Sequence, residues 1–147
     1  MSDISFRLYR ADDREACLAL FDENCPAFFA ANERADYAEF LDTQPSEYQV
    51  CLKADVIIGA FGLMGSAADW RDLNWILISP HSQGLGLGTQ FIRRVVQQAK
   101  PAGLTGITIA TSHLAEPFFA KHGASKICKI EHGWGKGMHR VDMELKL

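Results

Sequence analysis

The segment best suited to chemistry is a glycine-rich loop, which reads Gln83, Gly84, Leu85, Gly86, Leu87, Gly88 and Thr89. Glycine allows the backbone to turn tightly and brings its N–H groups close to a ligand. An apolar, strand-like stretch precedes this loop, and an amphipathic, helix-like stretch follows it. Because the N-terminus of a helix favours an anion, we expect the loop to bind phosphate groups, most simply a diphosphate.

Two common phosphate-binding motifs do not fit this loop. A Walker A loop ends in Gly-Lys-Ser/Thr, whereas Gly88 is followed directly by Thr89. A dinucleotide-binding fingerprint reads G-x-G-x-x-G and has an acidic residue about 20 positions later, whereas residues 105–113 contain no acid. The sequence therefore argues against a nucleoside-triphosphate enzyme and against a Rossmann-type dehydrogenase.

The loop resembles the acetyl-coenzyme A signature of the GNAT-type N-acetyltransferases, Q/R-x-x-G-x-G/A, through Gln83, Gly86 and Gly88. Residues 78–80 resemble the apolar-x-Pro that leads into this signature, and residues 115–123 resemble the later N-x-x-A-x-x-F-Y-x-K-x-G helix of the family. The resemblance implies one acetyltransferase domain over residues 1–147, with acetyl-CoA as co-substrate. It also implies transfer of an acetyl group to a primary amine by direct attack on the thioester.

The same resemblance implies an α/β fold and a cofactor site. The expected fold is a mixed, mostly antiparallel seven-stranded sheet, flanked by about four helices and splayed between strands 4 and 5. In this family the pantetheine arm of the cofactor lies along the fourth strand, here near Ile76, Leu77 and Ile78, and the whole loop from Gln83 to Thr89 holds the diphosphate. Ser112 stands where the family often has an asparagine that hydrogen-bonds the cofactor.

Phe119 is the main departure from the family pattern. It occupies the place of the tyrosine that commonly protonates the leaving thiolate, and a phenylalanine cannot donate a proton. We expect Phe119 to remain part of the cofactor site. Two interpretations stay open: an enzyme that obtains this proton from solvent or another group, or a non-catalytic acyl-CoA-binding or sensing module.

Three further residues are candidates for the reaction. His113 follows a predicted strand at the edge where open α/β sheets bind ligands, and the pKa range of a histidine would suit a proton donor. Asn74 on the fourth strand could orient the attacking amine, and Trp134 in a glycine-rich turn could form a wall of the substrate pocket. The structural alternatives are an exposed loop histidine, a solvated edge residue and a tryptophan folded onto the core.

Acidic residues recur along the second predicted helix, at Glu33, Asp36, Glu39 and Asp42. Such a run either attracts a cationic substrate or forms a solvated helix face. The sequence does not decide between the two.

Composition limits the classes of partner. Hydrophobic residues make up 48% of the chain, charged residues 22%, and the net charge is −3 with scattered basic residues, which disfavours nucleic-acid and anionic-membrane binding. The four cysteines show no metal-binding or disulfide spacing, so we expect no metal. The N-terminal residues lack the pattern of a secretory signal, which favours the cytoplasm. The expected partner is a small-molecule amine or an exposed amino group, and a homodimer stays open as an oligomeric state.

Periodicity predicts the elements that must position these residues. Apolar alternation or apolar runs predict strands at residues 4–8, 48–52, 56–64, 73–78, 107–111, 128–134 and 141–147. Helical spacing predicts helices after Asp12 or Asp13, at about 32–41, from the glycine loop to Pro101, and over 115–122. A strand, the glycine loop, a helix and another strand then form a right-handed crossover unit.

Overall fold

The computed structural model describes residues 4–65, 68–82 and 86–147. Three residues of the predicted diphosphate loop, Gln83, Gly84 and Leu85, lie outside these ranges. Their proposed contacts with the cofactor therefore rest on the sequence alone.

The seven strands form one sheet in the order β1-β2-β3-β4-β5-β7-β6. Every neighbouring pair is antiparallel except β4 and β5, which run parallel. The strands are β1 (Ile4–Leu8), β2 (Tyr48–Lys53), β3 (Val56–Met64), β4 (Trp70–Ile78), β5 (Gly106–Ser112), β6 (Ser125–Gly135) and β7 (Met138–Lys146). The predicted mixed, mostly antiparallel seven-stranded sheet is confirmed.

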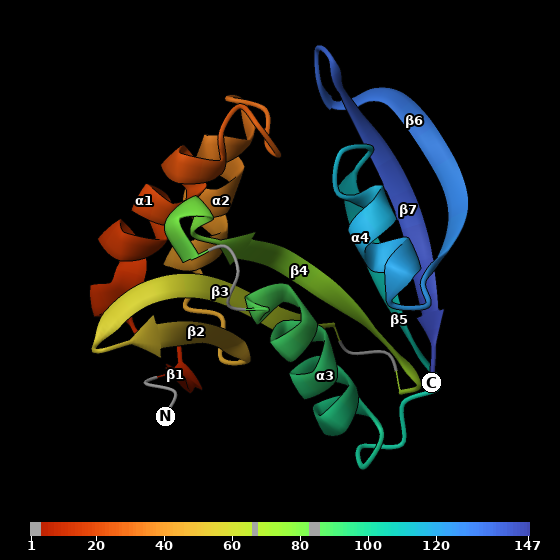
Figure 1. Ribbon diagram of the computed structural model, residues 1–147, viewed down its shortest axis with the longest axis horizontal. Helices are drawn as coiled ribbons and strands as arrows, with labels where there is room; N and C mark the ends of the chain where they lie inside the picture. The colour runs from red at the N-terminus through yellow and green to blue at the C-terminus, as the bar shows by residue number, and fades with distance from the viewer. Residues whose placement is uncertain (1–3, 66–67, 83–85) are drawn as a thin grey trace.

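Four α-helices cover the sheet, as Figure 1 shows. They are α1 (Arg14–Asn24), α2 (Glu33–Asp42), α3 (Leu87–Ala99) and α4 (Glu116–Lys121), with short 3-10 turns at η1 (Ala11–Asp13) and η2 (Pro80–Ser82). In the described part of the chain, none of these helices is long and apolar enough to cross a bilayer.

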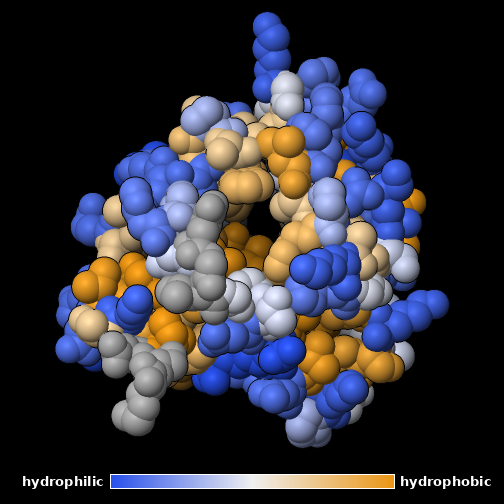
Figure 2. Space-filling model, in the orientation of Figure 1, coloured by the Kyte–Doolittle hydropathy of each residue, from blue (hydrophilic) through white to orange (hydrophobic). Residues whose placement is uncertain are grey.

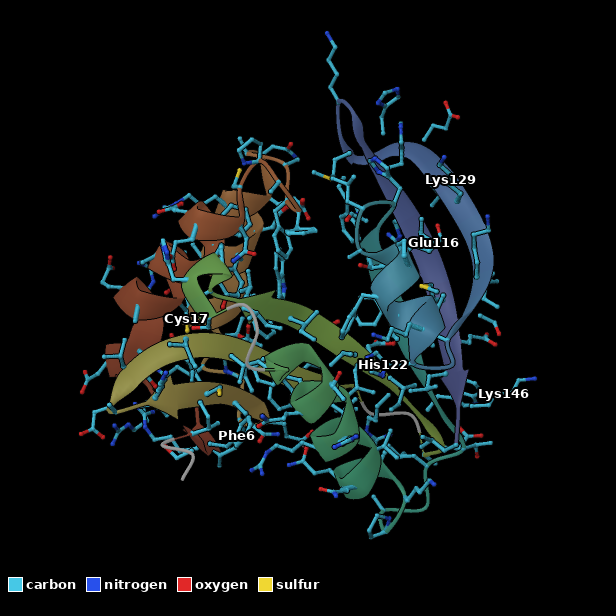
Figure 3. All side chains as sticks on the ribbon, viewed as in Figure 1. Phe6, Cys17, Glu116, His122, Lys129 and Lys146 are labelled. Atoms are coloured by element: carbon cyan, nitrogen blue, oxygen red, sulfur yellow. The ribbon has the colours of Figure 1, made fainter. Side chains whose placement is uncertain are left out.

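Two apolar clusters lie on opposite faces of the sheet. One packs α1 and α2 against β2 and β3 and contains Phe21, Tyr37, Tyr48 and Leu77. The other packs α3 and Phe119 of α4 against the opposite face. Figure 3 shows Cys17 of α1 near the sheet and His122 in the region between α3 and α4. The amphipathic stripe of α3, with Phe91 and Val95 fully buried, accounts for its docking.

The parallel pair β4 and β5 is joined over only part of its length. Residues Trp70 to Leu73 pair with Gly106 to Ile109, and beyond this point the two strands separate, as is visible in Figure 1. The predicted splay between strands 4 and 5 is therefore confirmed. It leaves the C-terminal halves of both strands facing a gap instead of each other.

A β-bulge in β4 accounts for the separation. The register with β3 shifts between Ala60 and Gly62, and Trp75 adopts a left-handed backbone conformation with φ of 48°. Because a bulge bends the strand that contains it, β4 turns away from β5 just after Leu73, which is the last residue of β4 that pairs with β5. The Tyr48 hydroxyl donates a hydrogen bond to the Trp75 carbonyl oxygen and supports this conformation.

Candidate active site

A cavity of about 590 Å³ lies where β4 and β5 separate. Figure 2 shows the molecule hollowed near the middle of this face, with mainly apolar residues around the opening. The walls come from the link between α1 and α2, from β4, β5 and α4, and from Trp134 of β6. The lining residues are Asn24, Phe28, Phe29, Glu33, Leu73, Asn74, Trp75, Ile76, Ile78, Ser79, Pro80, Ile109, Ala110, Thr111, Ser112, Leu114, Ala115, Phe118, Phe119 and Trp134.

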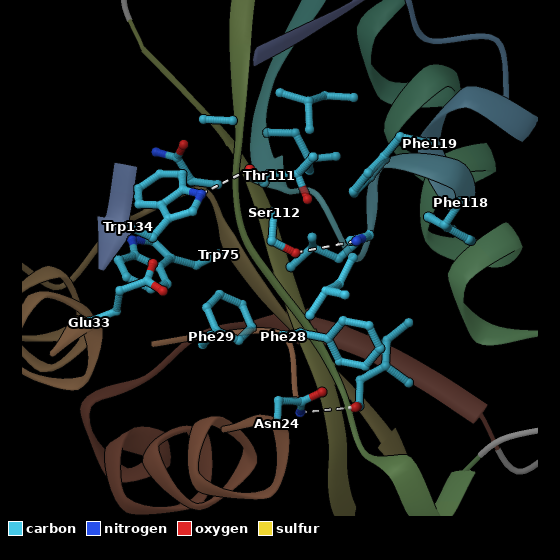
Figure 4. A pocket seen from close by; sticks show the side chains of 18 of the residues that line it. Asn24, Phe28, Phe29, Glu33, Trp75, Thr111, Ser112, Phe118, Phe119 and Trp134 are labelled. Atoms are coloured by element: carbon cyan, nitrogen blue, oxygen red, sulfur yellow. Dashed lines mark hydrogen bonds between the residues drawn. The ribbon is translucent and has the colours of Figure 1, made fainter. Parts of the chain in front are cut away.

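The cavity has two ends, which Figure 4 shows from close by. Phe118 and Phe119 of α4 lie at one end, and Glu33, Trp75 and Trp134 lie at the other. We call the first the cofactor end and the second the acceptor end, after the predicted roles of Phe119 and Trp134.

Four of the predicted cofactor-binding residues line the cavity: Ile76, Ile78, Ser112 and Phe119. The Ser112 hydroxyl accepts a hydrogen bond of 3.2 Å from the Ala115 backbone N–H, so it caps the turn into α4. The side chain of Leu77 packs on the opposite face with α1 and α2. The side chain of Leu77 therefore cannot contact a ligand in the cavity, and only its backbone could do so.

The N-terminus of α3 lies beside this end. Gly86 is the N-cap residue in a left-handed conformation with φ of 67°, and among the described residues, its chain neighbours aside, no atom lies within 4 Å of the position that a Cβ would take. A Cβ on Gly88 would instead lie 2.7 Å from ring atoms of Phe118. The glycine at position 88 is thus also required for the packing of α3 against α4.

The other two described loop residues have structural contacts. Leu87 is buried in the core, and the Thr89 hydroxyl lies 3.3 Å from Nε2 of His122. Their backbone N–H groups belong to the first turn of a helix, where they have no intrahelical acceptor. Thr89 therefore links α3 to α4 through its side chain while its backbone can still face an anion.

The cofactor end fits the chemistry of coenzyme A. The first turn of a 13-residue helix supplies donors and a positive dipole for a diphosphate. Next to it, the unpaired halves of β4 and β5 form an apolar slot with Ile76 and Ile78 on one side. A pantetheine arm has apolar carbons and amide groups, so an apolar slot edged by backbone N–H and C=O groups matches it.

The acceptor end is assembled from segments that lie far apart in the sequence. Trp134 Nε1 donates a 2.8 Å hydrogen bond to the Thr111 carbonyl, which fixes its ring on the end of β5. Asn32 Nδ2 donates a 2.8 Å hydrogen bond to the Trp134 carbonyl, which ties the β6–β7 hairpin to the start of α2. Trp134 lines the cavity, and its contact with the substrate stays a prediction.

Glu33 is the residue that sequence reasoning did not single out. It is only 4% exposed, lines the cavity, and its Oε2 accepts a 2.8 Å hydrogen bond from the Ala30 N–H. Burial raises the pKa of its carboxyl to about 7, and the nearby Asp36 adds to this effect while the Ala30 bond opposes it. Asp36, Glu39 and Asp42 on the same helix are exposed. The acidic run is therefore a solvated face with one buried member.

Asn74 and His113 have different positions relative to the cavity. Asn74 lies on β4 and lines it, whereas His113 is not among the described lining residues. The Nδ1 of His113 accepts a 3.2 Å hydrogen bond from the His139 N–H, and the two rings are 4.6 Å apart. Further along the hairpin, the Nδ1 atoms of His139 and His132 accept bonds from the backbone N–H groups of His132 and Gly137.

These histidines do not form a metal site. Within the described ranges, no group of three or more His, Cys, Asp or Glu residues is arranged to hold a metal ion. Burial lowers the pKa of His139, and the neighbouring His113, Lys129 and His132 add to this effect. The three histidines are therefore best described as side chains whose Nδ1 atoms accept backbone hydrogen bonds within the hairpin region.

Comparisons with known proteins agree with the fold. The sequence model of the Acetyltransferase (GNAT) family matches residues 17–124. No protein of curated function matches the sequence.

Three solved structures illustrate the structural likeness. Ard1 from Thermoplasma volcanium superposes with a TM-score of 0.82 at 10% identity, over 99% of this chain and 98% of that one. The ribosomal-protein-S18-alanine N-acetyltransferase from Escherichia coli gives 0.78 at 12% identity, over 97% and 93%. N-acetylglutamate synthase from Neisseria gonorrhoeae, complexed with coenzyme A and N-acetyl-glutamate, gives 0.78 at 18% identity, over 100% of this chain and 36% of that one.

Proposed function

This chain belongs to the GNAT family of acetyltransferases, and on that basis we propose that it transfers the acetyl group of acetyl-CoA to a primary amine by direct attack on the thioester. The observation that supports this reaction best is the single cavity that opens from the slot beside the α3 N-terminus to the acceptor end. Both substrates can occupy it together, as direct attack requires.

The proposed reaction forms one bond and breaks one. The lone pair of the uncharged amine forms a C–N bond with the thioester carbonyl carbon, and the C–S bond breaks. One proton leaves the nitrogen and one ends on the sulfur, which yields an amide and free coenzyme A. The residues that line the cavity would hold the two reactants close together. Positioning of this kind accounts for a large part of the rate enhancement in such reactions.

The source of the proton for the thiolate is constrained by Phe119, which lines the cavity and has no donor. A free thiol has a pKa near 8.5, so its thiolate is an acceptable leaving group even without a dedicated acid. We propose that solvent supplies the proton, with His113 as the alternative donor. Phe119 is also the one residue that favours a binding module without turnover.

A binding assay and a turnover assay test the proposal separately. Acetyl-CoA should raise the melting temperature, because a ligand that binds only the folded state stabilises it by about 2.7 kcal/mol at a hundredfold excess over Kd. NADH and ATP serve as controls and should have smaller effects. Incubation of acetyl-CoA with a panel of primary amines should then release a free thiol. Stabilisation by acetyl-CoA without thiol release from any amine would favour the binding module instead.

A further inference from the structure

The acceptor end contains one ionisable group. Among the described residues that line the cavity, Glu33 is the only one with a titratable side chain. Its Oε2 already accepts the Ala30 N–H. A carboxylate has about four acceptor positions, so Glu33 retains capacity for the donors of a ligand. Since Glu33 is only 4% exposed, such a ligand would meet it away from bulk water.

Several aromatic rings also line the cavity. Trp75 and Phe29 stack with ring centroids 6.1 Å apart and an interplanar angle of 20°. Trp134 and Phe28 also line the cavity, and Figure 4 shows Trp75 and Trp134 close to Glu33. Ring faces of this kind pack against flat apolar groups and attract cations.

No positive side chain lines the described part of the cavity. The guanidinium carbon of Arg140 lies 5.1 Å from the Trp134 ring centroid, but Arg140 does not line the described cavity, and its Nε donates a 2.7 Å hydrogen bond to Asp142. A carboxylate or phosphate on the acceptor would therefore be buried beside Glu33 without a counter-charge. Such burial is strongly unfavourable.

Resting on the acetyl transfer proposed above, we infer that the acceptor is a primary amine on an aromatic or similarly flat apolar body without a carboxylate or phosphate, and that Glu33 binds its ammonium group. The Glu33 carboxylate accepts a charge-assisted hydrogen bond from the ammonium group and takes one of its protons before attack, so that the amine reacts uncharged. The aromatic rings contact the body of the acceptor. The hydrogen bond from Ala30 orients the carboxyl group, because it links the side chain to the turn that precedes α2.

The test measures binding to the protein saturated with coenzyme A, so that it does not depend on turnover. The two ligands are 2-phenylethylamine and 2-phenylethanol, which differ in the ammonium group. The variant is Glu33→Gln, which keeps an oxygen that can accept the Ala30 N–H and so preserves the turn. Glu39→Gln, on the exposed face of the same helix, is the matched control for loss of one negative charge.

We expect Glu33→Gln to weaken binding of the amine by roughly 10- to 100-fold, the usual range for a lost hydrogen bond to a charged group. Binding of the alcohol should change by less than about threefold on the same scale, as should binding of coenzyme A. Glu39→Gln should leave all three affinities within that limit. Equal weakening of the amine and the alcohol in Glu33→Gln would overturn the role of Glu33.

Phenylalanine tests the class of acceptor, because it carries the same ring and amine with an added carboxylate. We expect it to bind the wild-type protein at least about tenfold more weakly than 2-phenylethylamine. Equal or tighter binding of phenylalanine, or no binding of 2-phenylethylamine, would overturn the inference. If a different amine is then turned over, the proposed acetyl transfer stands and only the inferred acceptor class is wrong. If 2-phenylethylamine binds as expected but no amine is turned over, the acetyl transfer is wrong and the binding preference stands.

Discussion

The two ends of the cavity are built in opposite ways. The cofactor end, as proposed, is formed by the end of β4 and the N-terminus of α3, which lie within one continuous segment, residues 76–89. The acceptor end uses side chains from α2, β4 and the β6–β7 hairpin, and one of its hydrogen bonds joins residues 102 positions apart. In the proposed reaction, the first would hold a co-substrate common to the family, and the second would select the acceptor.

The largest expected effect is at the cofactor end, from Gly88→Val. The added side chain should block close approach of a diphosphate to the helix N-terminus and raise the Kd of coenzyme A by at least about a hundredfold, equivalent to two lost charge-assisted hydrogen bonds. Isothermal titration with coenzyme A measures this change. The acceptor end should keep its affinity for amines.

The double variant Gly88→Val/Phe118→Ala separates two causes. In the single variant the new Cβ also meets the Phe118 ring, which should reduce stability by about 1–3 kcal/mol through overpacking. Removal of that ring should recover stability without recovering affinity for coenzyme A. Recovery of both would show that Gly88 serves only the packing of α4.

A second effect concerns the stability that the protein loses by burying the charged carboxylate of Glu33. Because the pKa of Glu33 is about 7 in the folded protein and ordinarily near 4.5, the unfolded chain releases this proton first. The free energy of unfolding therefore falls as pH rises from about 4.5 to about 7 and is then constant. Glu33→Gln should remove this loss, so its stability relative to wild type should be higher at pH 8 than at pH 4, by on the order of 3 kcal/mol.

Thermal unfolding of Glu33→Gln and wild type at the two pH values measures the difference. Glu39→Gln should show no comparable pH dependence, since Glu39 is exposed. A stability difference of Glu33→Gln that is the same at pH 4 and pH 8 would contradict a buried, high-pKa carboxyl at the acceptor end.

Trp134→Ala should have a smaller effect, confined to the amine. Loss of the ring and of its hydrogen bond to Thr111 removes part of the cavity wall, so KM for the amine should rise about tenfold, with kcat reduced by less than about threefold. Trp134→Phe keeps an aromatic wall, so its KM for the amine should lie between those of wild type and Trp134→Ala. A destabilised Trp134→Ala protein with unchanged KM would place this tryptophan in a purely structural role.

The smallest effect is expected for His113→Ala. Since His113 lies outside the described lining of the cavity and accepts the His139 N–H, we expect kcat to fall by less than about threefold. Positioned acid catalysis typically contributes about 10²- to 10⁴-fold. A loss of a hundredfold or more, with unchanged affinity for coenzyme A, would instead identify His113 as the proton donor.

The sequence predicts the cofactor end and most of the fold because their signals are local. Apolar periodicity marks the strands and helices within a residue or two of most of their observed ends, and the glycine loop stands between a strand and a helix in one continuous segment. The splay of β4 and β5 followed only from the family resemblance. Nothing in the apolar run of β4 indicates that Trp75 adopts a positive φ.

The acceptor end was only partly predictable, because tertiary contacts define it. Trp134 stood out as a tryptophan between glycines, but its partner Thr111 lies on another strand. Glu33 was one of four acids on a helix, and its burial is evident only in the folded protein. Its place at the start of α2, three residues after the Ala30 N–H that it accepts, is the local signal that separates it from the others.

The partial pairing of β4 and β5 also has a kinetic consequence. The proposed diphosphate site lies beside α3, on one face of the sheet, whereas Glu33 belongs to α2, on the other. If both proposals hold, acetyl-CoA and the amine enter from different faces of the sheet and meet where β4 and β5 separate. Neither product must leave before the other reactant enters, so initial-rate plots at several fixed amine concentrations should intersect, as in a ternary-complex mechanism, instead of running parallel.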